Sequence, residues 1–198
     1  MQVDIVIFDG FDELDAIAPY EVMRTAEALG ADIRAELVGA HGAATITASH
    51  GARLVVDRGP DEGADLLLVP GGGYFDTGGG VATETARGDL PALLARAQAG
   101  GAAIGSVCTG AMLLVAADLV AGRVATTHHD AVEDLRAAGA EVPDGARVVD
   151  AGDLITAGGV TAGIDLALWL VEREAGSEIA NQTAREIEHE RSGAIERV

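Results

Sequence analysis

Short apolar runs separated by helix-length segments constrain the fold of this chain most strongly. Apolar residues dominate the runs at 3–8, 65–69 and 102–107. A strand that is apolar almost throughout is buried on both faces, which is typical of a parallel sheet covered by helices. The segments 15–29 and 89–99 between these runs have helical length and composition. The alternation predicts an α/β fold with a mostly parallel sheet.

The other segments extend this pattern. A chain of 198 residues with 48% hydrophobic content can bury one substantial core, so we expect a single domain over residues 1–198. Further strands are expected at 33–38, in a small antiparallel excursion at 45–48 and 54–56, and in a hairpin at 147–150 and 154–156. Further helices are expected at 109–119, 131–138, 161–175 and 178–191.

The charge balance restricts the partners of the protein. Acidic residues number 32 against 13 basic residues, all of which are arginine, for a net charge of −19. Such a surface repels nucleic acid and anionic lipid, so we expect a small-molecule substrate and neither of those partners. The acidic residues are scattered from Asp4 to Glu196 rather than clustered. This scatter favours adaptation to concentrated salt over a specialised acidic binding face.

The same sequence features favour a cytoplasmic protein. A single cysteine gives no intramolecular disulfide and suits a reducing interior. No uninterrupted apolar stretch reaches the roughly 18 residues that a membrane span requires. The first seven residues resemble a core strand and lack the basic flank and cleavage site of a signal peptide. We therefore expect a cytoplasmic location without membrane contact.

Cys108 lies where a predicted strand runs into a predicted helix. A thiol there is exposed to the positive end of the helix dipole and to unpaired N–H groups, and both favour the thiolate. The thiolate is the nucleophilic form, whereas an ordinary thiol has a pKa of about 8.5. We therefore expect a nucleophilic Cys108 with a pKa well below that value. The alternative is a small buried hydrophobic side chain.

Two further features reach the same edge of the predicted sheet. Asp15 begins the helix after the first strand, and Gly71 and Gly72 follow the third main strand. Ligands of open parallel sheets bind beyond the carboxyl ends of the strands, where the strand order switches. A carboxyl group, unhindered N–H groups and a thiol would form a catalytic site there. The alternatives are a helix N-cap for Asp15 and simple turns for the glycines, with Asp12 and Glu13 solvated.

Three residues close to these positions have open roles. Thr109, just inside the helix, could contact substrate or donate a first-turn hydrogen bond. His128 and His129 could be an acid, a ligand or ordinary loop residues. One cysteine and two adjacent histidines lack the spacing of a metal site, and the glycine-rich segment 74–80 lacks the spacing and lysine of a P-loop. We therefore expect neither a metal nor a cofactor.

These residues belong to a set of longer segments at 14–15 with 19–22, 69–73, 106–111, 123–128 and 155–165. Taken together, the segments resemble the ThiJ/PfpI superfamily over nearly the whole chain. Within that superfamily the chain is most similar to the isocyanide hydratases and to the ligand domains joined to AraC-type regulators. The resemblance implies a flavodoxin-like three-layer α/β/α sandwich, a homodimer, and a Cys108 on a strained nucleophile elbow.

Departures from the other branches of the superfamily favour the hydratases. The protease-like and glutamine-amidotransferase-like members have a histidine immediately or soon after the cysteine, where this chain has Thr109. Glyoxalase and deglycase members usually carry glutamate in place of Asp15, in a different surrounding motif. The hydratases typically have a large aromatic residue where this chain has His129. That difference affects the size of substrate and the polarity of the pocket that the resemblance implies.

The resemblance and the residue chemistry together predict hydration of an isocyanide to an N-substituted formamide without a cofactor. Cys108 would attack the terminal carbon, and Asp15 would be the general acid and then the base that activates water. A neighbouring thiolate opposes ionisation of Asp15, so we expect its pKa to be raised. Thr109 and the N–H groups of Gly71 or Gly72 would orient substrate or stabilise developing charge.

Two alternative functions use the same residues. The first is a glyoxalase III or deglycase activity on 2-oxoaldehydes, in which Cys108 and Asp15 would be joined by His128 at the substrate-binding site. The second is a non-catalytic protein, either a cysteine oxidation sensor or a ligand-binding domain. Lactate formation from methylglyoxal would favour the first, and inactivity with a readily oxidised Cys108 would favour the second.

Overall fold

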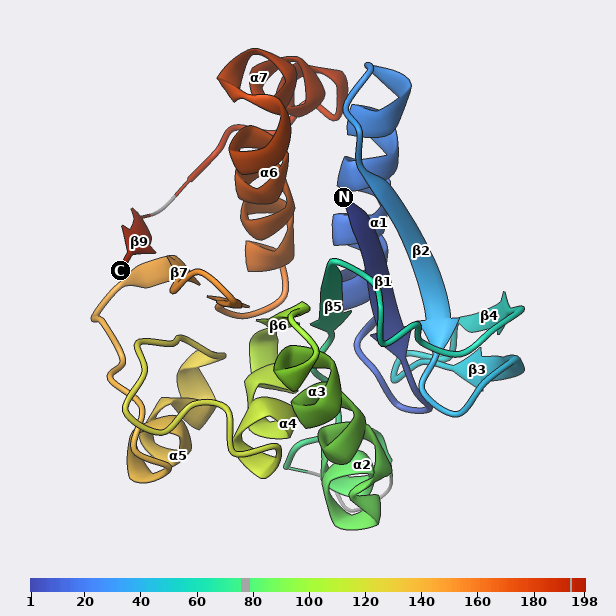
Figure 1. Ribbon diagram of the computed structural model, residues 1–198, viewed down its shortest axis with the longest axis vertical. Helices are drawn as coiled ribbons and strands as arrows, with labels where there is room; N and C mark the ends of the chain where they lie inside the picture. Colours follow the sequence, from blue (N-terminus) through green and yellow to red (C-terminus); the bar gives the residue numbers. More distant parts are fainter. Residues whose placement is uncertain (76–78, 193) are drawn as a thin grey trace.

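The computed structural model describes residues 1–75, 79–192 and 194–198. In this part of the chain seven strands form one sheet in the order β2-β1-β5-β6-β8-β7-β9 (Figure 1). Neighbouring strands are parallel except for β7 and β8. The strands are β1 (Gln2–Ile7), β2 (Arg34–Gly39), β5 (Leu66–Val69), β6 (Ala103–Val107), β7 (Ala146–Asp150), β8 (Leu154–Ala157) and β9 (Ala194–Arg197).

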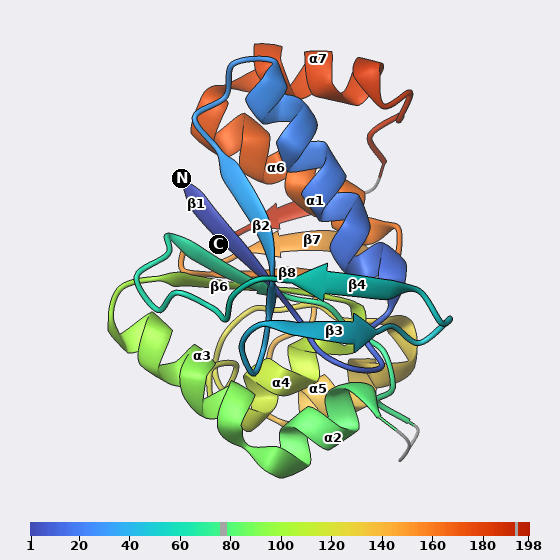
Figure 2. The ribbon, with the colours of Figure 1, turned by 90° about the vertical axis from the view of Figure 1, so that its right-hand side faces the viewer.

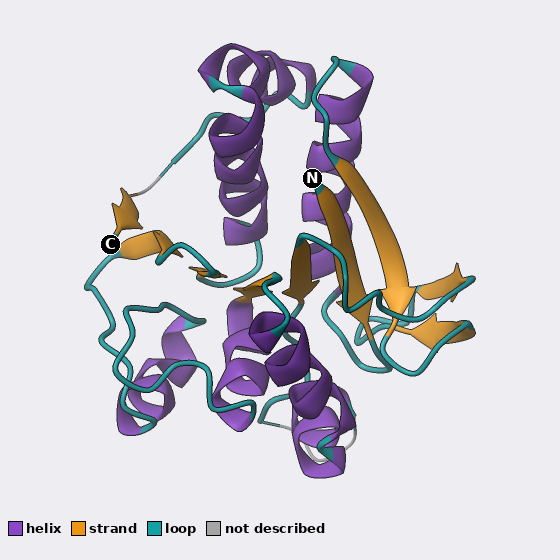
Figure 3. Ribbon diagram, viewed as in Figure 1, coloured by secondary structure: helices purple, strands orange, loops and turns teal. Residues whose placement is uncertain are grey.

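Helices cover both faces of this sheet. Helices α1, α6 and α7 pack together on one face, and α2, α3, α4 and α5 lie on the other (Figures 2 and 3). The predicted α/β/α sandwich with a mostly parallel sheet is therefore confirmed. The helices are α1 (Glu13–Ala28), α2 (Gly80–Arg87), α3 (Asp89–Ala99), α4 (Ala111–Ala116), α5 (Val132–Ala137), α6 (Ala162–Ala175) and α7 (Ser177–Glu186).

The central strands owe their place to their apolar sequence. All four residues of β5, three leucines and a valine, are buried because helices cover both faces of the sheet. Strand β5 pairs with β1 on one side and with β6 on the other. From β1 the chain first forms β2 at one side and later returns to form β5 at the other. The strand order therefore reverses between β1 and β5, and the loops beyond their carboxyl ends can form a site there.

The structure differs from the sequence-based expectation in two additional elements and at the ends of several helices. Helix α2 and strand β9 were not predicted, and the helix predicted to reach residue 191 ends at Glu186, shortly before the left-handed Glu188. The helix after Cys108 begins as a single 3₁₀ turn, η1 (Cys108–Gly110), and α4 ends just before Asp118, which has a φ of 59°. The predicted antiparallel excursion is the hairpin of β3 (Ala44–Thr47) and β4 (Arg53–Val56).

No helix in the described residues has both the length and the apolar character needed to cross a membrane.

Candidate active site

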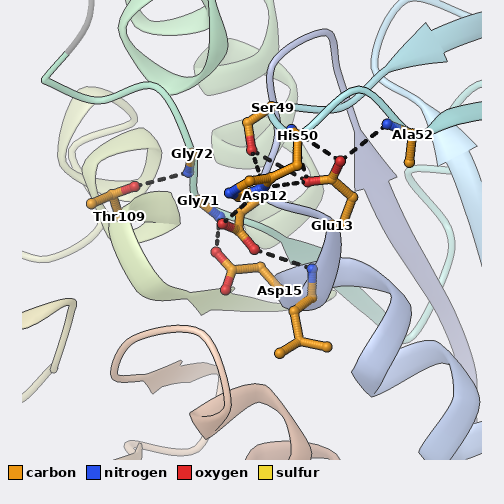
Figure 4. Close-up of polar contacts among 10 residues, drawn as sticks. Asp12, Glu13, Asp15, Ser49, His50, Ala52, Gly71, Gly72 and Thr109 are labelled. Atoms are coloured by element: carbon orange, nitrogen blue, oxygen red, sulfur yellow. Dashed lines mark hydrogen bonds and ion pairs between the residues drawn. The ribbon is translucent and has the colours of Figure 1, made fainter.

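The carboxyl ends of β1, β5 and β6 bring three of the predicted residues together. Asp15 lies in the first turn of α1, Gly71 follows β5, and Cys108 follows β6. The Gly71 N–H donates to Oδ2 of Asp15 at 2.9 Å (Figure 4). The Cys108 thiol lies next to the same carboxyl group, close enough for each to shift the pKa of the other. The sequence-based expectation that these residues converge is therefore met by the geometry.

Cys108 has the backbone conformation of a nucleophile elbow. Its φ of 58° places a non-glycine residue in the left-handed region, which costs about 1–2 kcal/mol. Neighbouring loops hold it there: its N–H donates to the Gly158 carbonyl at 2.9 Å, and its carbonyl accepts the Thr127 hydroxyl at 2.8 Å. These bonds fix the direction of the side chain, which is 7% exposed.

The thiol of Cys108 opens onto a pocket of about 350 Å³. The pocket walls come from the start of α1, the segment after β5, the elbow itself and the loops before α5 and α6. Although the side chain is largely buried, a small ligand in this pocket can therefore reach the sulfur. The lining residues are Asp12, Gly72, Gly73, Tyr74, Phe75, Cys108, Thr109, His128, Asp130 and Val160.

Asp15 is a buried acid and not the N-cap of its helix. The N-cap is Asp12, whose Oδ1 accepts the Leu14 N–H at 3.1 Å. Asp15 is fully buried, and its Oδ1 has no hydrogen-bond partner of good geometry among the described residues. Burial raises the pKa of Asp15 to about 7, and the charge of Asp12 adds to the rise against the hydrogen bonds of Gly71 and Cys108. The predicted rise in the pKa of Asp15 is confirmed, although its main cause is burial and not a neighbouring thiolate.

The expectation of a low Cys108 pKa is wrong for this structure. Burial raises the pKa of the thiol to about 12, and the Asp15 carboxylate raises it further. The N–H groups of Val160 and Thr109 act in the opposite direction but do not compensate. The helix dipole is weak here because the elbow leads into one 3₁₀ turn and a six-residue helix. Between pH values of about 7 and about 12 the pair therefore holds one proton, on the thiol, and one negative charge, on Asp15.

Gly71 and Gly72 do not offer the free N–H groups that the sequence led us to expect. The Gly71 N–H is used by Asp15, and the Gly72 N–H donates to Oγ1 of Thr109 at 3.0 Å. The donors that face the sulfur are instead the backbone N–H groups of Thr109 and Val160. Val160 was missed, and its one sequence signal is its place directly after a glycine pair near the end of a strand.

Gly71 has a structural role that only glycine can fill. A Cβ there would lie 2.6 Å from both the backbone nitrogen and Oγ1 of Thr109, and 3.0 Å from Oδ2 of Asp15. The Gly71 carbonyl also accepts the Asp12 N–H at 2.8 Å. Gly71 therefore allows the start of α1 and the elbow to pack directly against each other, with no room for a side chain between them.

His128 lines the pocket, whereas His129 does not. The His128 ring packs on Gly159, where a Cβ would lie 2.5 Å from Cδ2, and its Nδ1 accepts the Asp130 N–H at 3.3 Å. Burial lowers the pKa of His128, and His129 lowers it further, so the ring is neutral at pH 7. The His129 side chain is 81% exposed. Of the two histidines, only His128 can contact a ligand of Cys108 in this pocket.

One group of side chains could approach a metal ion. His128, His129 and Asp130 offer ligand atoms within 4.8 Å of one another. Its two histidines are adjacent in sequence, and one ring nitrogen already accepts a backbone N–H. The expectation that the protein works without a metal stays a prediction.

Asp12 and Glu13 are not the solvated loop residues that we expected. Asp12 lines the pocket. Glu13 fastens the β3–β4 turn to the start of α1: its carboxylate accepts the backbone N–H groups of His50 and Ala52 and the Ser49 hydroxyl (Figure 4). Sequence reasoning could not pair Glu13 with a turn almost 40 residues away.

Most of the chain is similar to proteins of one family. The model of the DJ-1/PfpI family matches residues 1–173. An isonitrile hydratase from Pseudomonas putida is 34% identical over 195 residues, which cover 96% of this chain and 78% of that protein. The crystal structure of a ThiJ/PfpI family protein from Pseudomonas syringae matches with a TM-score of 0.83 and 26% identity, over 96% of this chain and 76% of that one. Drosophila melanogaster DJ-1beta matches with a TM-score of 0.80 and 21% identity, over 96% and 98%.

Proposed function

This chain belongs to the DJ-1/PfpI family, and on that premise we propose that it hydrates isocyanides to N-substituted formamides with Cys108 as nucleophile and Asp15 as proton carrier. Isonitrile is another word for isocyanide, so the 34% identical isonitrile hydratase supports this reaction among those of the family. The observation that carries the proposal is the fully buried Asp15 carboxyl beside the only cysteine of the chain. One oxygen of this carboxyl has no hydrogen-bond partner of good geometry among the described residues.

The first step forms the carbon–sulfur bond. Asp15 takes the thiol proton as the sulfur attacks the terminal carbon of the isocyanide, and then delivers that proton to the same carbon. The product is a thioimidate in which Cys108 is bound to a CH=N–R group, and Asp15 is again a carboxylate. A pKa of about 7 allows Asp15 both to accept and to donate this proton near neutral pH.

The second step releases the product. Asp15 takes a proton from water, and the resulting hydroxide adds to the thioimidate carbon while the nitrogen receives the proton. Collapse of this tetrahedral adduct breaks the carbon–sulfur bond and gives R–NH–CHO. The hydroxyl proton passes through Asp15 back to the sulfur. The thiol and the carboxylate are restored, and no oxidant, reductant or cofactor enters the cycle.

The remaining pocket residues support these steps. The N–H groups of Thr109 and Val160 stabilise the sulfur when it carries negative charge. Neutral His128 is one polar side chain of the pocket that can orient a bound substrate. We also propose a cytoplasmic homodimer without nucleic acid partners, as the family resemblance and the net charge of −19 favour.

The test is a formamide assay by proton NMR with a simple alkyl isocyanide. The wild type and Asp32→Asn, a variant of an exposed residue, are expected to form the formyl product at equal rates. In Cys108→Ser and Asp15→Asn the rate of formamide formation is expected to fall at least about a hundredfold, which is the usual effect of losing a nucleophile or a general base. Formamide production by Cys108→Ser at the wild-type rate would exclude the covalent route.

The intermediate gives a second measurement. The thioimidate retains every atom of the isocyanide, so the mass of trapped protein should increase by the full mass of the substrate.

Methylglyoxal serves as the competing substrate, because its conversion to lactate without glutathione would favour the glyoxalase alternative.

A further inference from the structure

The pocket over Cys108 carries negative charge at its opening. Asp12 enters its wall from the N-terminus of α1, and Asp130 enters it from the turn η2 (His129–Ala131). We call these two carboxylates the acidic rim. Both act on one pocket residue, because the charges of Asp130 and of Asp12 each favour the protonated form of His128. The two rim residues, more than 100 positions apart in sequence, therefore act on the same small volume.

Nothing among the described lining residues neutralises the rim. The lining contains no arginine, and its one basic residue, His128, is kept neutral by burial. The imidazole of His50 lies 4.0 Å from Asp12, but its nearer partner is Glu13 at 2.8 Å. Among the described residues, the Asp130 carboxylate is paired with the rings of His128 and His129, and its side chain is 59% exposed.

Two arginines close to the pocket form ion pairs with other carboxylates. Arg136 and Arg147 line a neighbouring hollow and not this pocket. Arg136 is paired with Glu133 and Asp144. The Arg147 guanidinium is bonded to Asp165 and to the Thr161 hydroxyl. These side chains therefore cannot cancel the charge of the acidic rim without breaking their own ion pairs.

Two aromatic rings line the same pocket as the two carboxylates. The rings of Tyr74 and Phe75 are 4.8 Å apart in an edge-to-face arrangement, and both residues line the pocket. The Tyr74 hydroxyl donates to Asp134 at 2.9 Å, which fixes its ring. Aromatic faces attract cations, so these rings and the acidic rim favour the same kind of ligand.

We propose that the acidic rim makes the Cys108 pocket selective for substrates that carry a cationic group, such as an ammonium, and that Asp12 and Asp130 determine this specificity. The proposal deepens the proposed function by naming its substrate class: an isocyanide with a positively charged substituent. Anionic compounds are rejected because they would meet two carboxylates at the opening, and the Asp15 carboxylate beyond the sulfur.

The experiment uses the single cysteine and needs no turnover. Two methanethiosulfonates of similar size, one with a trimethylammonium group and one with a sulfonate, each form a mixed disulfide with the thiol and release methanesulfinate. The ratio of their rate constants is divided by the ratio for a small neutral thiol. This quotient reports the charge preference of the pocket and is independent of the pKa of Cys108.

The variants separate the rim from the overall acidity of the protein. Asp12→Asn keeps the helix cap, since asparagine is an equally good N-cap, and Asp130→Asn changes an exposed side chain. At 0.15 M salt we expect a wild-type quotient of at least about ten. Each rim variant should lower it by about fivefold, because the Coulomb energy of one charge at roughly 7 Å in water favours the cationic reagent and opposes the anionic one. Asp32→Asn alters the net charge equally at a remote exposed site and should leave the quotient unchanged.

The outcomes distinguish this proposal from the proposed function. A quotient near one, equal effects of Asp32→Asn and the rim variants, or a sulfur that reacts with neither reagent would overturn the charge selection. A high, rim-dependent quotient in a protein that forms no formamide would retain the selection and reject the hydratase. Where formamide is formed, a cationic isocyanide should have a higher kcat/KM than an anionic one, and the rim variants should reduce that difference.

Discussion

Asp15 and Cys108 place a carboxyl group and a thiol against each other at the bottom of a pocket, with both side chains largely buried. Asp15 is fully buried and Cys108 is 7% exposed. Burial raises the pKa of Asp15 to about 7 and that of Cys108 to about 12, so between these values the pair carries one negative charge and one proton. The elbow therefore holds a thiol whose base is already in place, rather than a preformed thiolate.

This arrangement predicts how alkylation of Cys108 depends on pH. With iodoacetamide the rate should rise up to about pH 7 and then level off, because ionised Asp15 takes the thiol proton. In Asp15→Asn the levelling should disappear and the rate should keep rising with pH, since burial still holds the thiol pKa high. Asp12→Asn is the control: it should keep the plateau but lower its midpoint, because the Asp12 charge contributes to the raised pKa. Identical profiles for the wild type and Asp15→Asn would contradict the pairing.

The same buried acid predicts a stability gain on substitution. The ordinary pKa of an aspartate is 3.8, so between that value and about 7 the unfolded chain is ionised while the folded protein stays protonated. The contribution of Asp15 to the free energy of unfolding is thus fully present below pH 3.8. It is lost as the pH rises to about 7, which lowers the stability of the folded protein by about 4 kcal/mol. Asp15→Asn keeps an oxygen for the Gly71 N–H. Its free energy of unfolding, measured in urea, should exceed that of the wild type by a few kcal/mol at pH 8 and converge with it near pH 4.

Two glycines at the site predict opposite responses to alanine. At Gly71 a Cβ would lie 2.6 Å from the Thr109 backbone, so Gly71→Ala should lose about 1–3 kcal/mol of stability and most of the activity. At Gly158 a Cβ would have its nearest neighbours at 3.8 Å, which is ordinary contact. Gly158→Ala should therefore fold and react like the wild type. Thermal unfolding and the formamide assay measure both effects, and equal losses in the two variants would show that close approach at Gly71 is not what matters.

The sequence was sufficient to predict which strands would carry the site. Apolar runs as uniform as that of β5 fit only a sheet covered on both faces, and the rule for strand ends then places Asp15, Gly71 and Cys108 together. The antiparallel hairpin of β3 and β4 was equally clear from its alternation of apolar and polar residues. These features are local, so a single sequence contains them.

The electrostatics of the site could not be predicted in the same way. A strand-to-helix turn indicates a dipole, but the sign of the Cys108 shift depends on how deeply the thiol is buried. Whether the Gly71 and Gly72 amides are free depends on acceptors 56 and 37 residues away. Asp12 resembled a solvated residue, because nothing in the local sequence shows that it lines a pocket. Each error concerns contacts between segments distant in sequence.

Thr109 is a positioning residue, and its hydroxyl allows a final prediction. Its Oγ1 accepts the Gly72 N–H, and the neighbouring Gly71 N–H holds Asp15. Thr109→Val keeps the shape but removes the acceptor, which leaves the Gly72 N–H unpaired at a cost of about 1–3 kcal/mol. The Gly71 bond to Asp15 should loosen, and because that bond lowers the Asp15 pKa, the midpoint of the alkylation profile should move above about 7. Formamide kcat/KM should fall by about tenfold. Thr109→Ser restores the acceptor and should return both the midpoint and the rate towards wild type, whereas a loss of stability alone would leave the midpoint in place.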